Sequence, residues 1–360
     1  MIKIKGKIIN YDKSFNGEIQ FNEKINKIKK LKKLDTEDLI VPGFIDLHCH
    51  GGNGYDTMDG WKSIKEMSNF HLRRGTTSIL PTTWTSTLEH TLDALKDFKN
   101  FKNYNSNILG VHLEGPFINP NKLGAQPPLA IKPSIDFVKK VQEIAPIKVI
   151  TLAPELQGME HFIDYINKLG IKVQFGHSLA DYECCSKFMK KYKIGFTHLY
   201  NAMSGNHHRI PGVLEAALEL GDFAEIICDF NHVSEASIKI AKKCIKNLYA
   251  VTDSMGATGL DNGVYKFFGK NIKKNEKIAV VTDTNTLAGS IIDMYETFTN
   301  LINISFSLND AIKMTSYNAA KYLERNDLGY IAEGKKSNIL VLDKALKIKE
   351  IYLNGIKIDD

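Results

Sequence analysis

Residues 39–50, LIVPGFIDLHCH, form a short apolar run that ends in two histidines. Seven further runs of this kind follow, apolar at first and polar at the end: TTSILPTT (76–83), ILGVHLEG (108–115), KVITLAPE (148–155), KVQFGHS (172–178), GFTHLYN (195–201), EIICDFNH (225–232) and LYAVTDS (248–254). Helix-like segments such as WKSIKEMSNFHLRR and MEHFIDYINKL separate the runs. Eight alternating units of strand and helix predict an α/β fold with a parallel sheet, closed as a (β/α)8 TIM barrel.

The two chain ends follow a different pattern. Residues 1–40 and the residues from 328 onward alternate apolar and polar positions, as half-exposed antiparallel strands do. Asn354-Gly355 carries the sequence signal of a tight hairpin. We therefore predict that residues 1–40 and 328–360 pair into one small β-sandwich, and that residues 41–327 form the barrel.

The length of the chain suits this division. A total of 360 residues accommodates a barrel of about 250 residues and a smaller module. Two segments depart from the alternation of strand and helix. Residues 257–290 have the glycine punctuation of hairpins, and residues 307–323 have the pattern of a closing helix.

Composition excludes several classes of function. The net charge of +6 comes largely from lysines in strand edges and loops, and the chain lacks an arginine-rich groove or an aromatic stacking platform, so we expect no nucleic-acid partner. No apolar run reaches the roughly 18 residues that a membrane span needs, and the first residues lack the apolar core of a signal peptide. The five cysteines follow no disulfide spacing. We therefore expect a cytoplasmic protein with no membrane partner.

Potential metal ligands recur where the predicted strands end. His48 and His50 are two residues apart, so on a strand both side chains point to the same face. Further imidazoles and carboxylates stand at the ends of other predicted strands: Glu114, His177, His198 and Asp253. A barrel gathers its strand ends at one face, so this registry predicts a single site. Nitrogen and oxygen ligands of this kind suit Zn²⁺ or Fe²⁺.

His48, His50 and Asp253 also have structural alternatives. Two histidines near a strand end are often only polar residues at the rim of a barrel. Asp253, in VTDS, could cap the N-terminus of a helix. The metal interpretation rests on the set of six residues, because each residue taken alone is weak evidence.

Several motifs together resemble one family. PGFIDLHCHG, HLEGPFINP, GHSLADY, THLYNAMSGNHHRIPG, DFNHVS and VTDSMGATG resemble the N-acetylglucosamine-6-phosphate deacetylases, which belong to the amidohydrolase superfamily. The resemblance covers nearly the whole chain. Its most specific part is residues 198–212, from HLYNAM to HHRIPG, which other amidohydrolases do not share.

The resemblance implies a division of roles among the predicted ligands. Glu114, His177 and His198 would hold the principal divalent ion, and His48 and His50 would hold a second ion with Glu114 between the two. Some members of the family lack these two histidines and use a single ion, so one or two ions per subunit are both open.

The resemblance also implies the reaction. Asp253 would be the general acid and base: it would take a proton from metal-activated water, which attacks the acetamide carbonyl, and would then protonate the leaving amine. The products would be glucosamine 6-phosphate and acetate, in amino-sugar catabolism and cell-wall sugar recycling.

The same resemblance assigns residues to the phosphosugar substrate. Arg209 and His232 would contact the 6-phosphate, donated across the interface of a homodimer, because in relatives the arginine reaches in from a neighbouring subunit. The other substrate-binding residues would be Asn201, Ala202, Gln126 and Leu287. Gln126 departs from the family, since some members have a histidine there that polarises the substrate carbonyl. A glutamine amide donates a hydrogen bond but carries no charge.

Three alternative functions remain. A cyclic-amide hydrolase usually bridges two metals with a modified lysine at the end of the fourth strand, where this chain has Glu155. An adenosine-type deaminase shares the His-x-His motif but does not account for HLYNAM or HHRIPG. A non-catalytic phosphosugar-binding protein on the same barrel is the third, since a fold does not fix a function.

Overall fold

The computed structural model describes residues 1–103, 107–267 and 269–359. Parallel strands form the centre of the larger part of the molecule. Six of them make one sheet in the order β12-β11-β10-β9-β8-β5, and β13 and β14 pair separately. Their bounds are β5 Phe44–Cys49, β8 Thr76–Thr83, β9 Val111–Glu114, β10 Ile147–Leu152, β11 Lys172–Phe175, β12 Ile194–Phe196, β13 Phe223–Ile227 and β14 Asn247–Val251. The predicted α/β fold with parallel strands is confirmed.

Backbone hydrogen bonds connect these two groups of strands at both sides. Leu199, just after β12, donates its N–H to the carbonyl of Glu225 in β13 at 2.9 Å. Asp253, just after β14, donates to the carbonyl of His48 in β5, also at 2.9 Å. The hydrogen-bonded circuit that begins at β5 therefore returns to β5. All the carboxyl ends of the strands lie at the same end of this circuit, because the strands are parallel.

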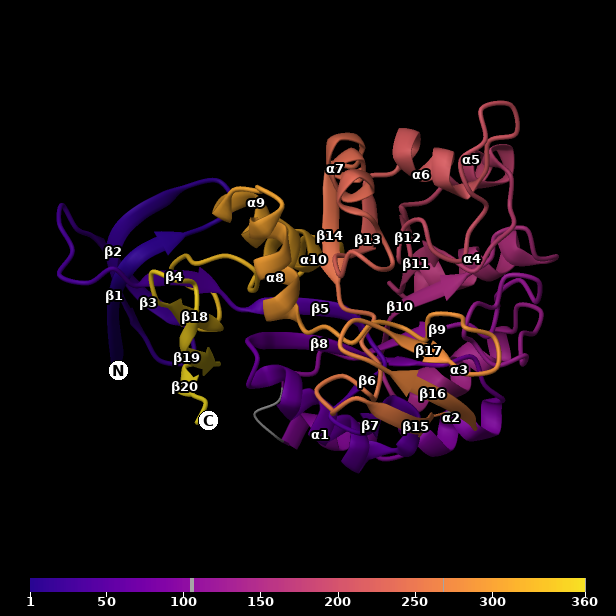
Figure 1. Cartoon of the computed structure of the whole chain (residues 1–360), viewed down its shortest axis with the longest axis horizontal. Helices are drawn as coiled ribbons and strands as arrows, with labels where there is room; N and C mark the ends of the chain where they lie inside the picture. The colour runs from indigo at the N-terminus through magenta and orange to yellow at the C-terminus, as the bar shows by residue number, and fades with distance from the viewer. Residues whose placement is uncertain (104–106, 268, 360) are drawn as a thin grey trace.

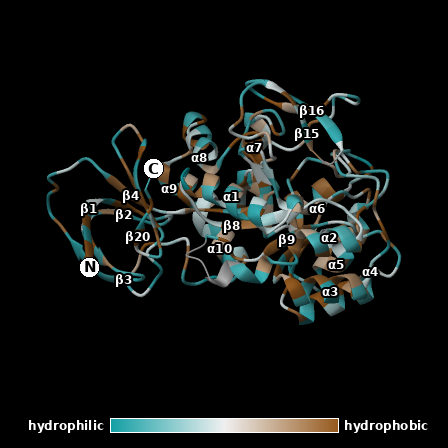
Figure 2. Cartoon of the chain, turned by 90° about the horizontal axis from the view of Figure 1, so that it is seen from below, coloured by the Kyte–Doolittle hydropathy of each residue, from teal (hydrophilic) through white to brown (hydrophobic). Residues whose placement is uncertain are grey.

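Helices follow the parallel strands along the chain (Figure 1). Their bounds are α1 Trp61–Leu72, α2 Leu88–Leu95, α3 Ile135–Ile144, α4 Met159–Lys168, α5 Tyr182–Met189, α6 Val213–Leu220, α7 Glu235–Cys244 and α8 Met294–Asn303, with short 3-10 turns at Thr57–Asp59 and Phe98–Asn103. Helix α3 is amphipathic: it buries Phe137, Val138 and Val141, and it carries both hydrophobic and hydrophilic colours in Figure 2. Among the described residues, no helix is long and apolar enough to cross a membrane.

The two chain ends meet in one seven-stranded sheet of order β20-β19-β18-β4-β1-β2-β3. Figure 1 shows indigo strands of the N-terminal segment beside yellow strands of the C-terminal segment. The bounds are β1 Ile2–Ile9, β2 Ser14–Phe21, β3 Ile25–Lys30, β4 Leu39–Pro42, β18 Ile339–Leu342, β19 Ile348–Leu353 and β20 Ile356–Lys357. The predicted turn between β19 and β20 is present, and Asn354 and Gly355 both have positive φ, as a tight two-residue hairpin turn requires.

This sheet does not lie flat. Phe21 of β2 packs edge to face on Tyr352 of β19 with ring centroids 5.0 Å apart, although three strands stand between β2 and β19 in the sheet order. Lys24, before β3, forms an antiparallel bridge with Lys336, before β18. The sheet therefore curls until residues near its two ends meet around one apolar core.

Local details differ from the sequence-based expectation at two places. The run 39–50 was expected to be one strand, but it divides at Gly43 into β4, which joins the terminal sheet, and β5. A Cβ at Gly43 would lie 2.1 Å from Thr77 Oγ1, so the close approach of β5 and β8 explains the glycine. The expected helix 307–323 contains a π-helical segment, Lys313–Tyr317, between α9 Leu308–Ile312 and α10 Asn318–Tyr322.

The remaining short strands lie between β5 and α1 and between β14 and α8. They are β6 Gly51–Gly52 with β7 Tyr55–Asp56, and the three-stranded antiparallel sheet of β15 Gly263–Phe267, β16 Lys270–Lys274 and β17 Ala279–Val281. The second group occupies the segment 257–290, where the sequence predicts hairpins.

Phe21→Ala tests the apolar core of the terminal sheet. Phe21 is fully buried, so the substitution should lower the free energy of unfolding by about 3–5 kcal/mol. Urea unfolding followed by circular dichroism measures the change. Lys7→Ala, at an exposed position of the neighbouring β1, should change it by less than about 0.5 kcal/mol. Equal stability of the two variants would contradict the packing described.

Candidate metal centre

One carboxylate oxygen, Glu114 Oε1, meets two histidines at the carboxyl ends of the strands. It lies 3.1 Å from His177 Nε2 and 3.1 Å from His198 Nε2, and these two nitrogens are 3.1 Å apart. Glu114 ends β9, and the two histidines follow β11 and β12. All three residues are buried.

The other oxygen of the same carboxylate meets a second pair of histidines. Glu114 Oε2 lies 3.0 Å from His50 Nε2 and 3.5 Å from His48 Nε2, and the two nitrogens are 3.2 Å apart. Asp253 Oδ1 stands 3.4 Å from each of them. The structure therefore brings all six predicted ligands together, with Glu114 between two groups of histidines.

The ring orientations direct lone pairs into the site. His50 Nδ1 donates to the carbonyl of Thr82 at 3.1 Å, and His177 Nδ1 donates to the carbonyl of Lys122 at 2.9 Å. A neutral imidazole that donates from Nδ1 has its lone pair on Nε2, and in both rings Nε2 is the atom next to Glu114. Such converging acceptors repel one another unless a positive charge lies between them.

The spacing of these atoms fits a divalent ion. Zinc–nitrogen bonds of about 2.0–2.1 Å at tetrahedral angles place ligand atoms about 3.3 Å apart, and the contacts around Glu114 span 3.0–3.5 Å. Three-residue groups able to hold a metal include His48, His50 and Glu114, and Glu114, His177 and His198. The donor set suits Zn²⁺ and Fe²⁺ equally.

The electrostatics of the site also favour a cation. Burial alone would raise the pKa of Glu114, but the neighbouring histidines, His48 foremost, hold that pKa well below its ordinary value. Burial would likewise lower the pKa of His48, but the carboxylates of Glu114 and Asp253 outweigh it and hold the pKa well above the ordinary value. The buried carboxylates thus favour positive charge beside the histidine nitrogens, which a divalent ion would supply.

Three of the six residues have strained backbone. His177, His198 and Asp253 have φ values of +50°, +29° and +49°, in the left-handed region that residues other than glycine rarely adopt. Conformations of this kind cost about 1–3 kcal/mol each and cluster at functional sites. The surrounding hydrogen bonds, such as Ser290 N–H to the Asp253 carbonyl at 2.8 Å, hold this backbone in place.

A pocket of about 270 Å³ opens over the metal ligands. It is lined by His50, Trp84, Glu114, Gly124, Ala125, Gln126, His177, His198, Asn201, Ala202, His232, Asp253, Thr286, Leu287 and Gly289. Trp84 stacks on the ring of His50 with centroids 4.0 Å apart and forms part of one wall. A small molecule in this pocket would contact Asp253 and the carboxylate of Glu114.

Most of the residues predicted to bind substrate line this same pocket: Asn201, Ala202, His232, Leu287 and Gln126. Gln126 donates its amide N–H to Glu114 Oε2 and accepts a hydrogen bond from the backbone N–H of Thr85, so it orients the Glu114 carboxylate. Arg209 is not part of the pocket. It lies in the exposed segment 205–211. His232, which is predicted to reach the site of a neighbouring subunit, lines the pocket of its own chain.

His232 has a buried partner, the carboxylate of Asp229. Its Nδ1 donates to Asp229 Oδ2 at 2.6 Å, and Asp229 Oδ1 accepts the backbone N–H of His232 at 2.8 Å. Burial lowers the pKa of His232, but the hydrogen bond and charge of Asp229 outweigh it and raise that pKa above its ordinary value. The ring therefore favours the charged form, which suits a negatively charged ligand.

Other functional residues were missed although the sequence carried a signal for them. Trp84 follows β8, and Asp229 follows β13, so both stand at strand ends like the predicted ligands. Glu225 and His112 lie inside the strands EIICDF and GVHLEG, and a polar side chain within an apolar strand indicates a buried partner. The sequence does not say which partner each of them has.

The chain is similar over most of its length to known proteins. A model of the amidohydrolase family matches residues 39–357. The N-acetylglucosamine-6-phosphate deacetylase of Bacillus subtilis (strain 168) is 37% identical over 333 residues, which are 87% of this chain and 83% of the relative. The N-acetylgalactosamine-6-phosphate deacetylase of Escherichia coli O157:H7 is 31% identical over 330 residues, 88% of this chain and 87% of the relative.

Solved structures show the same similarity. The N-acetylglucosamine-6-phosphate deacetylase of Thermotoga maritima is 32% identical, with a TM-score of 0.92 over 99% of both chains. The β-aspartyl dipeptidase of Fervidobacterium islandicum AW-1 has a TM-score of 0.60 at 14% identity, over 98% of this chain and 96% of the other, and shares the fold alone.

Adding Zn²⁺ to chelator-stripped protein should raise its melting temperature, and Glu114→Ala should abolish most of that rise. An ion that binds only the folded state stabilises it by about 2.7 kcal/mol at a concentration one hundred times its Kd, and the variant removes the carboxylate that both histidine pairs share. Differential scanning fluorimetry measures the shift.

Glu155→Gln is the matched control for this experiment. Glu155 accepts hydrogen bonds from Asn119, Ser178 and the backbone of Leu179, so its variant should keep the metal-dependent shift. Loss of the shift in Glu155→Gln with retention in Glu114→Ala would contradict the assignment and would favour a ligand at the end of β10.

Proposed function

The chain belongs to the amidohydrolase family, and we propose on this premise that it hydrolyses N-acetylglucosamine 6-phosphate to glucosamine 6-phosphate and acetate. The observation that carries the proposal is the carboxylate of Glu114 shared between two histidine pairs, with Asp253 beside them at the floor of a small pocket. Relatives that share most of this chain's length carry amino-sugar-phosphate deacetylase names.

Glu114, His177 and His198 would hold the principal divalent ion, Zn²⁺ or Fe²⁺. His48 and His50 would hold a second ion through the other oxygen of Glu114, with Asp253 next to it. When bound, such ions supply Lewis-acid chemistry, lowering the pKa of water from about 15.7 to about 7 and polarising a carbonyl oxygen.

Asp253 is the proposed general acid and base. Its carboxylate takes a proton from the attacking water, whose oxygen forms a bond to the acetyl carbon. Asp253 then delivers that proton to the sugar nitrogen as the carbon–nitrogen bond breaks. The amine leaves with that proton, and the acetyl group leaves as acetic acid, which carries the oxygen and the second proton of the water and then ionises to acetate. Its side chain is 12% exposed at the pocket floor, which gives it access to both positions.

The pocket residues would hold the rest of the substrate. His232, hydrogen-bonded to Asp229, and the amides of the Asn201-Ala202 turn would bind polar groups of the sugar phosphate, and Leu287 would pack on the acetyl methyl group. Gln126 would orient Glu114 and, on substrate binding, would donate to the carbonyl oxygen.

Arg209 would grip the 6-phosphate from a neighbouring subunit of a homodimer. In the single chain it lies outside the pocket on an exposed segment, next to Ile210, which is 71% exposed. An exposed apolar side chain of this size beside a guanidinium suits a surface that another copy of the chain covers.

The fold that carries the site would be a closed (β/α)8 barrel at residues 41–327 with a β-sandwich at 1–40 and 328–360. The hydrogen bonds of Leu199 to Glu225 and of Asp253 to His48 support closure of the barrel. The contact of Phe21 with Tyr352 supports a sandwich, since it joins distant strands of one curled sheet.

A role in amino-sugar catabolism and cell-wall sugar recycling follows from the substrate. This substrate would be supplied in the cytoplasm. The five free thiols suit a reducing compartment. The epimer N-acetylgalactosamine 6-phosphate is the substrate to compare, because one relative is named for it.

Acetate release separates this proposal from its rivals. Metal-loaded protein should release acetate from N-acetylglucosamine 6-phosphate, and metal-stripped protein should not. Hydrolysis of dihydroorotate or a hydantoin in place of the sugar would favour a cyclic-amide hydrolase. Binding of the sugar phosphate without acetate release would favour a non-catalytic binding protein.

Asp253→Asn should lower turnover by about 100- to 10,000-fold, because it removes proton transfer while keeping the size of the side chain. Metal content, measured by inductively coupled plasma mass spectrometry, should stay near that of the wild type. Wild-type turnover in the variant would exclude Asp253 as the general acid and base.

Arg209→Ala should reduce the preference for the phosphorylated over the unphosphorylated sugar, measured as a ratio of kcat/KM values. Mixing unfolded Arg209→Ala and Asp253→Asn subunits and refolding them together should restore activity to about one quarter of the wild-type level. Half of the dimers would then be mixed, and each mixed dimer has one complete site. No recovery in demonstrably mixed dimers would place Arg209 in its own subunit's site.

A further inference from the structure

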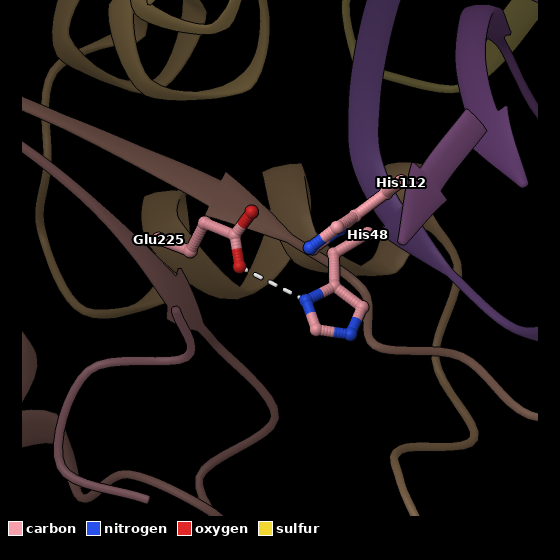
Figure 3. Close-up of side chains that lie close together, drawn as sticks. All are labelled: His48, His112 and Glu225. Atoms are coloured by element: carbon pink, nitrogen blue, oxygen red, sulfur yellow. Dashed lines mark hydrogen bonds and ion pairs between the residues drawn. The ribbon is translucent and has the colours of Figure 1, made fainter. Parts of the chain in front are cut away.

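His48, one of the predicted metal ligands, lies close to His112 and Glu225, and the three residues come from three different strands (Figure 3). All three are fully or almost fully buried, and the group has the spacing of a metal site. Both nitrogens of His112 are already used, however: Nδ1 contacts the carbonyl of Leu47 at 3.0 Å and Nε2 contacts Thr151 Oγ1 at 2.7 Å. The group is therefore better explained by hydrogen bonding than by a third ion.

Glu225 is the centre of this network. Its Oε2 accepts the Nδ1 proton of His48 at 2.9 Å and faces the backbone N–H of His198 at 3.3 Å. Its Oε1 accepts from the side-chain amide of Gln174 at 3.0 Å. No part of Glu225 is exposed, so water does not compete for these hydrogen bonds.

The hydrogen-bond network extends across the interior that the parallel strands surround. Gln174 also donates to the hydroxyl of Tyr249 at 2.6 Å and accepts from Thr197 at 2.9 Å. Both neighbours are fully buried. The carboxylate of Glu225 is thus fixed in position by side chains that do not touch the pocket.

His48 differs in this respect from the other three histidines. His50 and His177 donate from Nδ1 to backbone carbonyls, and within the described structure His198 Nδ1 has no hydrogen-bond partner. A carboxylate partner orients a ligand ring, fixes its tautomer and increases its basicity more than a carbonyl does. Of these four histidines, His48, which belongs to the proposed second metal site, is therefore held most firmly by its hydrogen-bond partner.

We infer that Glu225 is a positioning residue for the second ion: by accepting the Nδ1 proton of His48, it keeps the Nε2 lone pair of that ring directed at Glu114 Oε2 and Asp253. It touches neither the pocket nor the predicted substrate. The inference rests on the metal sites of the proposed function. It deepens them by making occupancy of the second site depend on a residue outside the ligand set.

Glu225→Gln tests the inference through metal binding. The variant keeps the size of the side chain but replaces the charged acceptor, so the affinity for the second ion should fall about 10- to 100-fold while the first ion stays bound. Titration of chelator-stripped protein with Co²⁺, followed by visible absorption and by metal analysis after dialysis, reports each ion separately. Asp293→Asn is the matched control, because Asp293 is a buried carboxylate that caps α8 and does not contact a ligand. It should bind both ions as the wild type does.

A double variant separates positioning from a general loss of structure. In a His48→Gln background, Glu225→Gln should cause no further loss of Co²⁺ binding, because the ring through which it acts is gone. If Glu225→Gln does not fold, Glu225→Asp withdraws the carboxylate from His48 and should weaken the second ion in the same direction.

Unchanged affinity for the second ion in whichever variant folds would overturn the inference, as would a wild-type protein that binds a single ion. Neither result depends on acetate release. A protein that binds two ions in a Glu225-dependent manner but releases no acetate would instead overturn the proposed function alone.

Discussion

The carboxylate of Glu114 is the interaction on which the site depends. It is 1% exposed, and its two oxygens meet four imidazoles within 3.5 Å. A buried charge surrounded by converging lone pairs is costly unless positive charge compensates it. Divalent ions on the two sides of this carboxylate would remove that cost, and the same ions would supply the chemistry that the proposed amide hydrolysis needs. Stability of the centre and its proposed reaction thus have one physical origin.

The fold explains how six residues from distant parts of the sequence meet at one site. Parallel strands place all their carboxyl ends at one face, and the side chains at or just after the ends of β9, β11, β12 and β14 meet those at the end of β5. Left-handed backbone at His177, His198 and Asp253 turns these side chains inward. The buried layer beneath, with Glu225 at its centre, holds His48 from below. The strands and their hydrogen bonds therefore fix the positions of the predicted ligand side chains. The exposed segment around Arg209 lies outside the pocket.

The sequence predicts a feature well where local pattern and physical cause coincide. Apolar runs that end in polar residues locate the strands, and the registry of His48, Glu114 and Asp253 with those ends predicts that they meet. Pattern alone does not reveal that residues 39–50 divide at Gly43, because the division depends on the close approach of Thr77 from another strand. The partner of Glu225 was not predictable either, since a hydrogen bond between residues 177 positions apart, as for His48 and Glu225, leaves no local signal.

Anomalous scattering from crystals of the zinc-loaded protein tests the central claim most directly. Data collected on the two sides of the zinc absorption edge locate bound zinc without reference to activity. We expect two anomalous peaks in each subunit, one between Glu114, His177 and His198 and the other between Glu114, His48 and His50. A fully loaded protein with no peak beside Glu114, or with zinc held by other residues, would contradict a metal centre built on this carboxylate.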